Sequence, residues 1–477
     1  MFGYSGSELL RLGIIAAYLG FIFVKGTLKA RKIGEADDFL LAGRNVPWWM
    51  LFATMGATVI GGGYSIGAVG KTYEWGLLMV LVSTAGYLHF LFSGLFVAPH
   101  FRRAELYTVA GYFGHRFGEG PRFVVLVVSL LFSVFIIAAQ MAAFGTVLST
   151  LLPNFADNVQ VLRWAIIVGG AMVVIYSTAG GLMAVIYTDI IQFVVLYIGF
   201  LVTAAICLPE LSANWGTITT TVPDGFFSPE GGKGWLFLVT TFLAFLFGET
   251  FAPGYATRYC VGRSIRDTKL GIAGVGGFLM LTFPVIIFVI ALYGRMWHGD
   301  ITAQQALPVV VKDLNNPIIG AILIAALLSA VMSSADSALN SSTAIFVKDL
   351  FEHQLGWEDK GDGRILRLAR WCSAGLGIAA TAIAVLWPDI ISLLLFTYHL
   401  WAPAIIVPVV VGVFSKERSP GLTRMILTTM LIAIAVTFAY RFTPWAETFD
   451  PAVFGVLVAT VAFASMVLTR RLRPAAA

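Results

Sequence analysis

The chain has 477 residues, of which 58% are hydrophobic and only 12% are charged. Ordinary soluble domains carry about 25% charged residues, so this composition excludes a soluble enzyme and indicates a protein embedded in a lipid bilayer. The net charge of +5 is modest and gives no reason to expect a nucleic-acid partner. The three cysteines are odd in number and lie within or beside apolar segments, so neither a disulfide framework nor a metal cluster is expected.

Apolar segments long enough to cross a bilayer, which takes about 20 residues, recur along the whole chain. The predicted spans number thirteen, with cores at 9–24, 47–69, 76–98, 123–151, 164–177, 184–208, 235–252, 271–293, 318–347, 371–387, 390–414, 425–440 and 451–469. The sequence therefore predicts an all-α polytopic membrane protein.

Lysine and arginine residues divide unequally between the two sides of the membrane that these spans define. If the N-terminus lies outside, 24 of the 31 basic residues fall on the inner side, including Arg258 after the seventh span. Inner loops of membrane proteins are enriched in Lys and Arg. The predicted orientation therefore has the N-terminus outside and the C-terminus in the cytoplasm. The predicted location is the plasma membrane, as the inner membrane of a bacterium.

The second span contains three consecutive glycines, Gly61 to Gly63. Each glycine weakens a helix by about 1 kcal/mol relative to alanine, so a helix break is expected near Gly61. Carbonyl groups freed inside a bilayer are tolerated only where protein or water satisfies them, and there they can coordinate a cation. Close helix packing through small residues is the alternative explanation.

The seventh span is interrupted in a similar way between Gly248 and Gly254, where the chain carries an acid, a proline and two glycines. Proline cannot continue a helix, because it lacks the backbone N–H and its ring clashes with the preceding turn. Two interrupted spans in corresponding halves of the chain are typical of an inverted-repeat transporter whose site lies near the middle of the bilayer.

The ninth span carries a stripe of oxygen-bearing residues at helical spacing, namely Ala330, Ser333, Ser334, Ser337 and Ser341. Such a stripe is costly against lipid and is expected to face protein, water or an ion. Carbonyl and hydroxyl oxygens suit a singly charged hard cation such as sodium, whereas zinc prefers nitrogen or sulfur ligands. The alternative is that each serine bonds back to the carbonyl four residues earlier.

Three acids lie within the predicted spans: Asp189, Glu249 and Asp336. Because a carboxylate is expensive to place in a bilayer, an acid there marks a functional site unless it is neutral or held by structural hydrogen bonds. The chain has no GxxxxGK[ST] loop for ATP and no Arg/Lys repeat of a voltage sensor. The scattered histidines give no metal spacing.

Together, these motifs resemble the sodium:solute symporter family. The segments that carry the resemblance are Asp38 to Arg44 with Trp48 and Trp49, Gly61 to Tyr64, Ala179 to Leu182, Tyr187 to Asp189 with Gln192, Arg258 and Tyr259 with Arg263, and Ala330 to Ser342. The resemblance implies the leucine-transporter fold, in which two inverted repeats of five helices surround a central site, here with one extra N-terminal helix and two extra C-terminal helices.

The resemblance also implies a division of the chain. It places an extra N-terminal helix and cytoplasmic loop at 1–46, the first repeat at 47–208, an extracellular connecting segment at 209–234, the second repeat at 235–414, and two peripheral helices with a basic tail at 415–477.

The family's main sodium site matches backbone oxygens of Ala57, Ile60 and Ala330 and the hydroxyls of Ser333 and Ser334. A second cation site of some members matches Asp189, Asp336 and Ser337, together with Ser333. Asp336 stands where those members have a hydroxyl. Either two carboxylates share an ion or one of them binds a proton, so one sodium, two sodium ions and a proton all stay open.

Within the family, Gly61 to Tyr64 and Met332 to Ser337 are most similar to the choline-transporter branch. That branch has tryptophans at the positions of Val59 and Ala252, and an aromatic cage is what a quaternary ammonium ion needs, so this departure counts against choline. The expected substrate-site residues are Tyr64, Gln140, Phe247, Glu249, Phe251, Tyr398 and Trp401.

The sequence thus predicts a sodium-coupled secondary active symporter that imports a small polar organic solute by alternating access. The expected coupling ion is Na⁺, and no organic cofactor, enzymatic activity or obligatory protein partner is expected; the partners are the solute and the lipid bilayer. One alternative is a proton-coupled symporter that uses Asp336 and Asp189. Another is a membrane sensor that retains the transporter fold.

Overall fold

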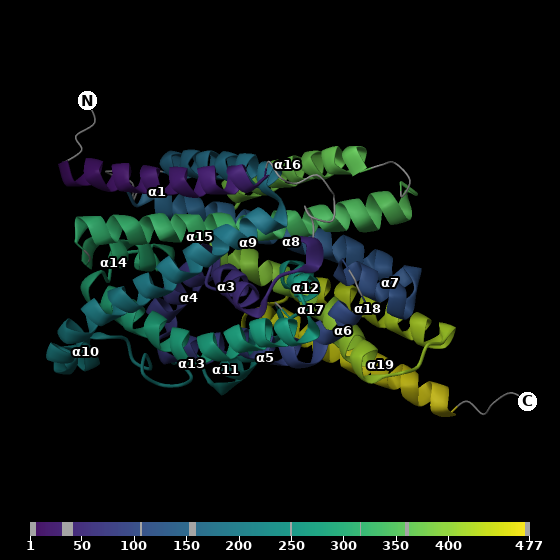
Figure 1. Cartoon of the computed structure of the whole chain (residues 1–477). Coiled ribbons are helices and arrows are strands. Elements are labelled where there is room, and N and C mark those ends of the chain that lie inside the picture. The colour runs from purple at the N-terminus through teal and green to yellow at the C-terminus, as the bar shows by residue number, and fades with distance from the viewer. Residues whose placement is uncertain are drawn as a thin grey trace, which may run out of the picture.

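The computed structural model describes residues 6–30, 42–104, 107–151, 159–248, 250–314, 316–357 and 362–472. In this part of the chain the regular structure is helical, apart from one isolated bridge between Val46 and Gly262 (Figure 1). The predicted all-α class is therefore confirmed. Residues 31–41, which hold much of the first family motif, lie outside the described residues.

The helices are α1 (Gly6–Ala30), α3 (Trp48–Val59), α4 (Gly62–Trp75), α5 (Leu77–Phe92), α6 (Ala98–Arg103), α7 (Val109–Phe117), α8 (Glu119–Ser149), α9 (Val159–Ala213), α10 (Trp215–Thr221), α11 (Trp235–Gly248), α12 (Pro253–Val261), α13 (Ile265–Trp297), α14 (Ala306–Leu314), α15 (Pro317–Ala344), α16 (Asp362–Leu386), α17 (Ile390–Phe414), α18 (Pro420–Tyr440) and α19 (Pro451–Leu472). Short tight or wide helical turns lie at Ala42–Arg44, Ser93–Val97, Ala303–Gln305, Ile345–Gln354 and Pro444–Glu447.

Among the described residues, 9 helices are long and apolar enough to cross a membrane, or up to 11 if each of two bent helix pairs forms one span. The other two predicted spans correspond to α1 and to a shorter apolar segment, Val159–Ile175. The count of thirteen therefore stays a prediction. Large apolar side chains such as Leu281, Trp371 and Leu386 point outward from the bundle, as expected of a surface that faces lipid.

The long helix α9 contains two apolar segments, Val159–Ile175 and Val185–Ala213, which correspond to the predicted spans 164–177 and 184–208. Figure 1 shows the ribbon reversing its direction between them.

Two contacts of α9 with α15 require this reversal. Ser333 of α15 donates a hydrogen bond to Asp189, and Ser177 donates one to Asp336 of α15. Ser333 and Asp336 lie within one turn of α15, whereas the residues from Ser177 to Asp189 would span about 18 Å in a straight helix. The two halves of α9 therefore lie on the same stretch of α15 as two separate spans.

Both predicted helix breaks are confirmed. Helix α3 ends at Val59 and α4 begins at Gly62, with a bend of 50° between them. Helix α11 ends at Gly248 and α12 begins at Pro253, with a bend of 47°. Pro253 stands at the first position of α12, where its missing N–H costs nothing.

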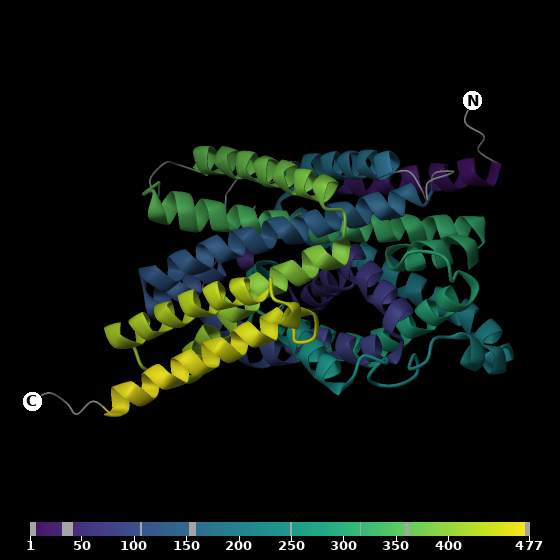
Figure 2. The same ribbon diagram turned by 180° about the vertical axis from the view of Figure 1, so that it is seen from behind.

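Helices α3, α4 and α12 lie in the interior of the bundle, whereas α11 runs along its lower edge in both views and contacts α5, α17 and α19 (Figures 1 and 2). Helices α1 and α16 form one outer edge and α18 and α19 lie toward the opposite side, while α8, α9, α13 and α15 pack around the inner three. The helix α1 begins at the end of the bundle opposite to that where α19 ends. An odd number of spans would place the two termini on opposite sides of the membrane, as this arrangement does.

Candidate functional site

The end of α3 meets the middle of α15 at Gly61. A Cβ atom added to Gly61 would lie 1.8 Å from the Ser334 Oγ atom, so only glycine allows this approach. The Ser334 hydroxyl donates to the Thr58 carbonyl at 3.3 Å, and the Ser65 hydroxyl donates to the Ile60 carbonyl at 2.7 Å. Hydroxyl groups from α15 and α4 therefore cover the carbonyls that the first break frees.

The residues of the expected main sodium site are all buried. Ala57 and Ile60 belong to the end of α3, and Ala330, Ser333 and Ser334 lie on the facing helix α15. The structure brings the two helices together at Ser334, as described above. The Ser333 hydroxyl is turned elsewhere, because it donates to Asp189 of α9.

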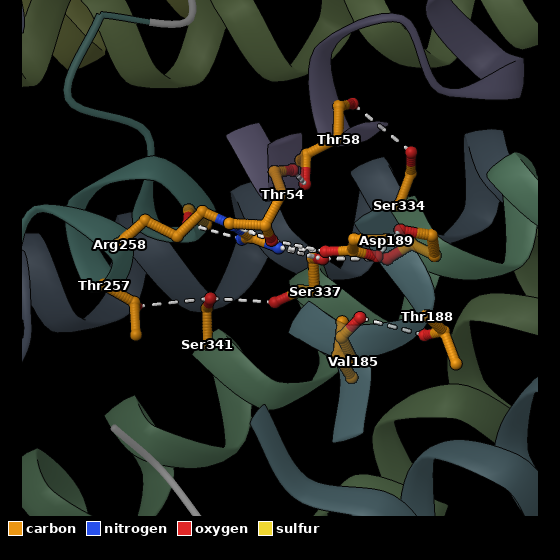
Figure 3. A network of polar contacts seen from close by, with 12 residues as sticks. Thr54, Thr58, Val185, Thr188, Asp189, Thr257, Arg258, Ser334, Ser337 and Ser341 are labelled. Carbon is orange, nitrogen blue, oxygen red and sulfur yellow. Dashed lines mark hydrogen bonds and ion pairs between the residues drawn. The ribbon is translucent and has the colours of Figure 1, made fainter. Parts of the chain in front are cut away.

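Asp189 is the centre of a second polar cluster (Figure 3). Its carboxylate is completely buried and accepts hydrogen bonds from the hydroxyls of Thr54 and Ser333. The Arg258 Nη2 atom lies 3.4 Å from Asp189 Oδ2, and neither side chain is exposed. The cluster therefore joins α3, α9, α12 and α15 in the interior of the protein.

Arg258 has a partner for each of its guanidinium nitrogens. Nε donates to Thr54 Oγ1 at 3.1 Å, Nη1 to the Gly254 carbonyl at 3.0 Å and Nη2 to Ser337 Oγ at 2.5 Å as well as to Asp189. Figure 3 shows the side chain reaching toward Asp189 with Thr54 and Ser337 on either side. A buried charge is tolerated when it is paired and hydrogen-bonded in this way.

This position corrects one part of the sequence analysis. Arg258 was counted among the basic residues on the inner side, but it lies within α12 and is 0% exposed. It therefore carries no information about orientation. The signal was available in the sequence, because Arg258 follows Pro253 by little more than one helical turn and is too close to the break to reach a loop.

Asp336 lies on the same helix as Ser333 but faces a different neighbour. Its carboxylate accepts a hydrogen bond from Ser177 in the first half of α9, and only 1% of the residue is exposed. Asp189 instead faces Thr54 and Arg258. The two acids that the sequence analysis placed at one cation or proton site are therefore held by separate partners.

The five serines of α15 between Ser333 and Ser342 divide into two groups. Ser337, Ser341 and Ser342 donate to the carbonyls four residues earlier, at 2.8, 2.8 and 2.5 Å. This is the back-bonding that the sequence analysis gave as the alternative. Ser333 and Ser334 instead donate to other helices. Only these two hydroxyls of the stripe therefore connect α15 to α9 and α3 by donation.

A cavity of about 60 Å³ lies beside both helix breaks. Small-molecule sites are about 300–1,000 Å³, so a solute larger than a few water molecules requires this cavity to widen. Its lining residues are Thr58, Val59, Tyr64, Phe132, Ser133, Ile136, Gln140, Ala252, Gly254, Tyr255, Ser334, Ser337, Ala338 and Leu394. None of these described residues carries a charged side chain. The cavity reaches Ser334, so it adjoins the contact between α3 and α15.

Of the seven residues expected to bind substrate, Tyr64 and Gln140 line this cavity. Trp401 is buried behind it and donates from Nε1 to the Thr250 carbonyl at 2.8 Å, while the Tyr398 ring packs against Gly248. Phe251 is also buried and has a positive φ of 64°.

Of the remaining two expected residues, Phe247 lies at the same break. The Phe247 carbonyl accepts a hydrogen bond from the Thr250 N–H at 3.2 Å, and Glu249 lies outside the described residues. Tyr398 and Trp401 therefore support the second break rather than the cavity wall.

Sequence reasoning missed most of the cavity wall. Phe132, Ser133, Ile136 and Gln140 form one face of α8. Their spacing is the signal that was available, because two polar residues recur on one face of an otherwise apolar span. Val59 and Ala252, which the sequence analysis compared with tryptophans, both line the cavity.

A comparison with known proteins connects this geometry to a family. The model of the sodium:solute symporter family matches residues 39–421. High-affinity choline transporter 1 of Drosophila melanogaster is 28% identical over 409 residues, which are 82% of this chain and 63% of the fly protein. The sodium/sialic acid symporter NanT of Aliivibrio fischeri is 26% identical over 367 residues, 70% of this chain and 68% of that protein. The chain thus matches less than two thirds of the fly protein's length.

Solved structures show the same fold. A sodium-coupled sialic acid symporter in a substrate-bound outward-open state superposes with a TM-score of 0.80 at 21% identity, covering 96% of this chain and 97% of that chain. Mhp1, a nucleobase-cation-symport-1 family transporter in a closed conformation, gives a TM-score of 0.61 at 16% identity, with 91% and 95% covered. The chain therefore has the leucine-transporter type of fold.

Proposed function

The chain belongs to the sodium:solute symporter family, and we propose that it imports a small polar organic solute together with sodium by alternating access. The observation that carries this proposal is the contact of the first helix break with Ser334, beside a cavity that both breaks border. A multi-pass membrane transporter places its binding site at such a position. The proposal includes the plasma membrane location with the N-terminus outside, and inverted repeats at 47–208 and 235–414.

The proposed sodium ligands are the carbonyls of Ala57, Ile60 and Ala330 and the hydroxyls of Ser333 and Ser334. Oxygen ligands of this kind suit a hard monovalent cation. The Ser334 hydroxyl already covers the end of α3, and a hydroxyl can rotate to accept an ion because its oxygen has two lone pairs. A sodium ion at this place ties α3 to α15.

The cavity wall supports a solute that carries no net charge. Burying an unpaired charge is costly, and the described lining has hydroxyl, amide and apolar groups but no charged side chain. A polar group of the solute would face Ser133 and Gln140, and its apolar part would face Ile136 and Phe132. Val59 and Ala252 make the wall aliphatic where a cage for a quaternary ammonium needs aromatic rings.

In this proposal, sodium binding is coupled to solute transport because the sodium site lies next to the cavity. Each sodium ion that moves inward gains about 2.3 kcal/mol per 100 mV of membrane potential. This energy drives uptake only if sodium binds the solute-competent conformation better than the other conformations. In our proposal sodium orders the end of α3 against α15, and α3 and α4 contribute Thr58, Val59 and Tyr64 to the cavity.

Uptake into proteoliposomes with an imposed sodium gradient tests this function. We expect sodium-dependent uptake that is lost when Ser333→Ala and Ser334→Ala are combined, because both hydroxyl ligands disappear. Ser342→Ala is the matched control on the same helix, since its hydroxyl donates only to the Ala338 carbonyl, and it is expected to retain uptake. Full uptake by the Ser333/Ser334 double variant would contradict the sodium site.

A proton-coupled symporter is the second candidate, and the buried carboxyl of Asp336 favours it, because its hydrogen-bond partner is the neutral hydroxyl of Ser177. An imposed pH gradient in sodium-free buffer separates the two candidates. Uptake under that condition favours the proton, and full sodium coupling in Asp336→Asn excludes it. A screen of small metabolites for thermal stabilisation in sodium and in potassium would identify the solute class.

A further inference from the structure

The cluster around Asp189 has the composition of a cation site. One carboxylate and the hydroxyls of Thr54, Ser333 and Ser337 converge there from α9, α3 and α15. Each of the four residues is buried. Oxygen ligands from several helices around one acid are what a hard cation requires, and a buried carboxylate needs a positive partner.

The positive group in this cluster is the guanidinium of Arg258. Nη2 lies between Ser337 Oγ at 2.5 Å and Asp189 Oδ2 at 3.4 Å, and Nε lies 3.1 Å from Thr54 Oγ1. Three of the four oxygen-bearing residues therefore already contact a cation that the chain itself supplies. The fourth, Ser333, donates to the same carboxylate.

The charges leave no reason for a second cation to bind. Asp189 and Arg258 together are neutral, so an added sodium ion would leave one uncompensated positive charge in the interior, close to the guanidinium. Asp336 is the nearest candidate to offset that charge, but its carboxylate is turned toward Ser177.

We propose that Arg258 is a tethered cation that fills the second cation position, so that this chain couples solute transport to a single exchangeable sodium ion, bound at the end of α3. The proposal rests on the function proposed above and specifies its ion stoichiometry. Arg258 cannot leave its site, because its side chain is anchored to α12 and to the Gly254 carbonyl. It therefore holds α12 to α3, α9 and α15 whether or not sodium is present.

The number of sodium ions tests the proposal directly. Radioactive sodium bound at saturation by the purified wild-type protein is expected to be one ion per chain, and the reversal potential of solute flux is expected to give one sodium per solute. In Arg258→Met, the freed carboxylate of Asp189 is expected to admit a second sodium ion, raising the Hill coefficient for sodium from about 1 to about 2.

Matched variants separate charge from packing. Arg258→Lys keeps a positive charge and is expected to bind one sodium ion. The double variant Asp189→Asn with Arg258→Met removes both charges and is also expected to bind one ion, at the end of α3. Adding Ser334→Ala to Arg258→Met is expected to remove one of its two ions, because Ser334 faces the end of α3 and lies outside the Asp189 cluster.

Two sodium ions in the wild type, or a single ion in a folded Arg258→Met, would overturn this proposal. If Arg258→Met does not fold, the wild-type stoichiometry and the neutral double variant decide the question. Failure of the proposed function looks different, because the wild type would then show neither bound sodium nor sodium-dependent uptake.

Discussion

Side chains donate hydrogen bonds to backbone carbonyls at both helix breaks, but the donors differ between the two. In the first break, the carbonyls of Thr58 and Ile60 accept from the hydroxyls of Ser334 and Ser65. In the second break, the carbonyls of Thr250 and Gly254 accept from the Trp401 indole and the Arg258 guanidinium. The difference is in the chemistry of the donors.

A hydroxyl donates and accepts, whereas an indole N–H and a guanidinium only donate. The hydroxyls at the first break can therefore turn and present oxygen to a cation. The donors at the second break cannot coordinate a cation, and they hold its carbonyls in a fixed arrangement. This difference in donors is the reason why we propose the ion site at the first break, whereas side-chain donors occupy the carbonyls of the second.

The largest effect, a loss of thermal stability, is expected from removing the negative charge of Asp189, which pairs with Arg258 of α12. Asp189→Asn leaves Arg258 buried without its acid, and breaking a buried ion pair from one side costs about 3–5 kcal/mol. We expect a large loss of thermal stability in detergent, measured by a melting curve of the purified protein. Asp189→Asn combined with Arg258→Met should recover most of this loss; equal instability of the single and double variants would show that charge is not the cause.

An intermediate effect is expected from filling the space at the first break. In Gly61→Ala the new methyl group would lie on the Ser334 Oγ atom and force this hydroxyl away from α3. Overpacking of this kind costs about 1–3 kcal/mol, so sodium affinity should fall about tenfold to a hundredfold, measured as the sodium concentration for half-maximal uptake. Gly67→Ala is the control, because its added atom makes only an ordinary contact with Ile391. Unchanged sodium affinity in Gly61→Ala would argue against an ion at this break.

The smallest effect is expected from removing one neutral donor at the second break. Trp401→Phe keeps an aromatic ring but removes the hydrogen bond to the Thr250 carbonyl, which is worth about 1 kcal/mol. We expect a slightly lower melting temperature and an unchanged sodium dependence of uptake. A change in sodium stoichiometry in this variant would mean that the second break also takes part in ion binding.

Local sequence was sufficient to locate the breaks and the oxygen stripe. Three glycines in one span, and a proline between glycines in another, weaken a helix wherever they stand, and the bends lie where they were predicted. The stripe on α15 follows from the helical period alone. The spacing of the breaks predicted an inverted-repeat transporter, and the family resemblance implied the leucine-transporter fold, which the solved structures confirm.

The partners of each polar group depended on how the helices pack. The serines of α15 look alike in sequence, yet Ser337 bonds within its own helix while Ser333 reaches α9. Arg258 resembled a residue of an inner loop, yet it is buried against Asp189. Tyr398 and Trp401 are predicted substrate-site residues, and the structure places both against the second break.

The sequence by itself determined that this chain is embedded in a bilayer. It also determined the positions of the helix breaks and the helix faces that carry oxygen atoms. These properties depend on neighbours along the chain and on the surrounding solvent. Only the tertiary structure decided which of these oxygen atoms contact the Arg258 guanidinium and which contact hydroxyl groups. That outcome depends on the rotation and contact of helices distant in sequence, as Asp189 and Arg258 show. A buried charge is stable only where such contacts supply its partner.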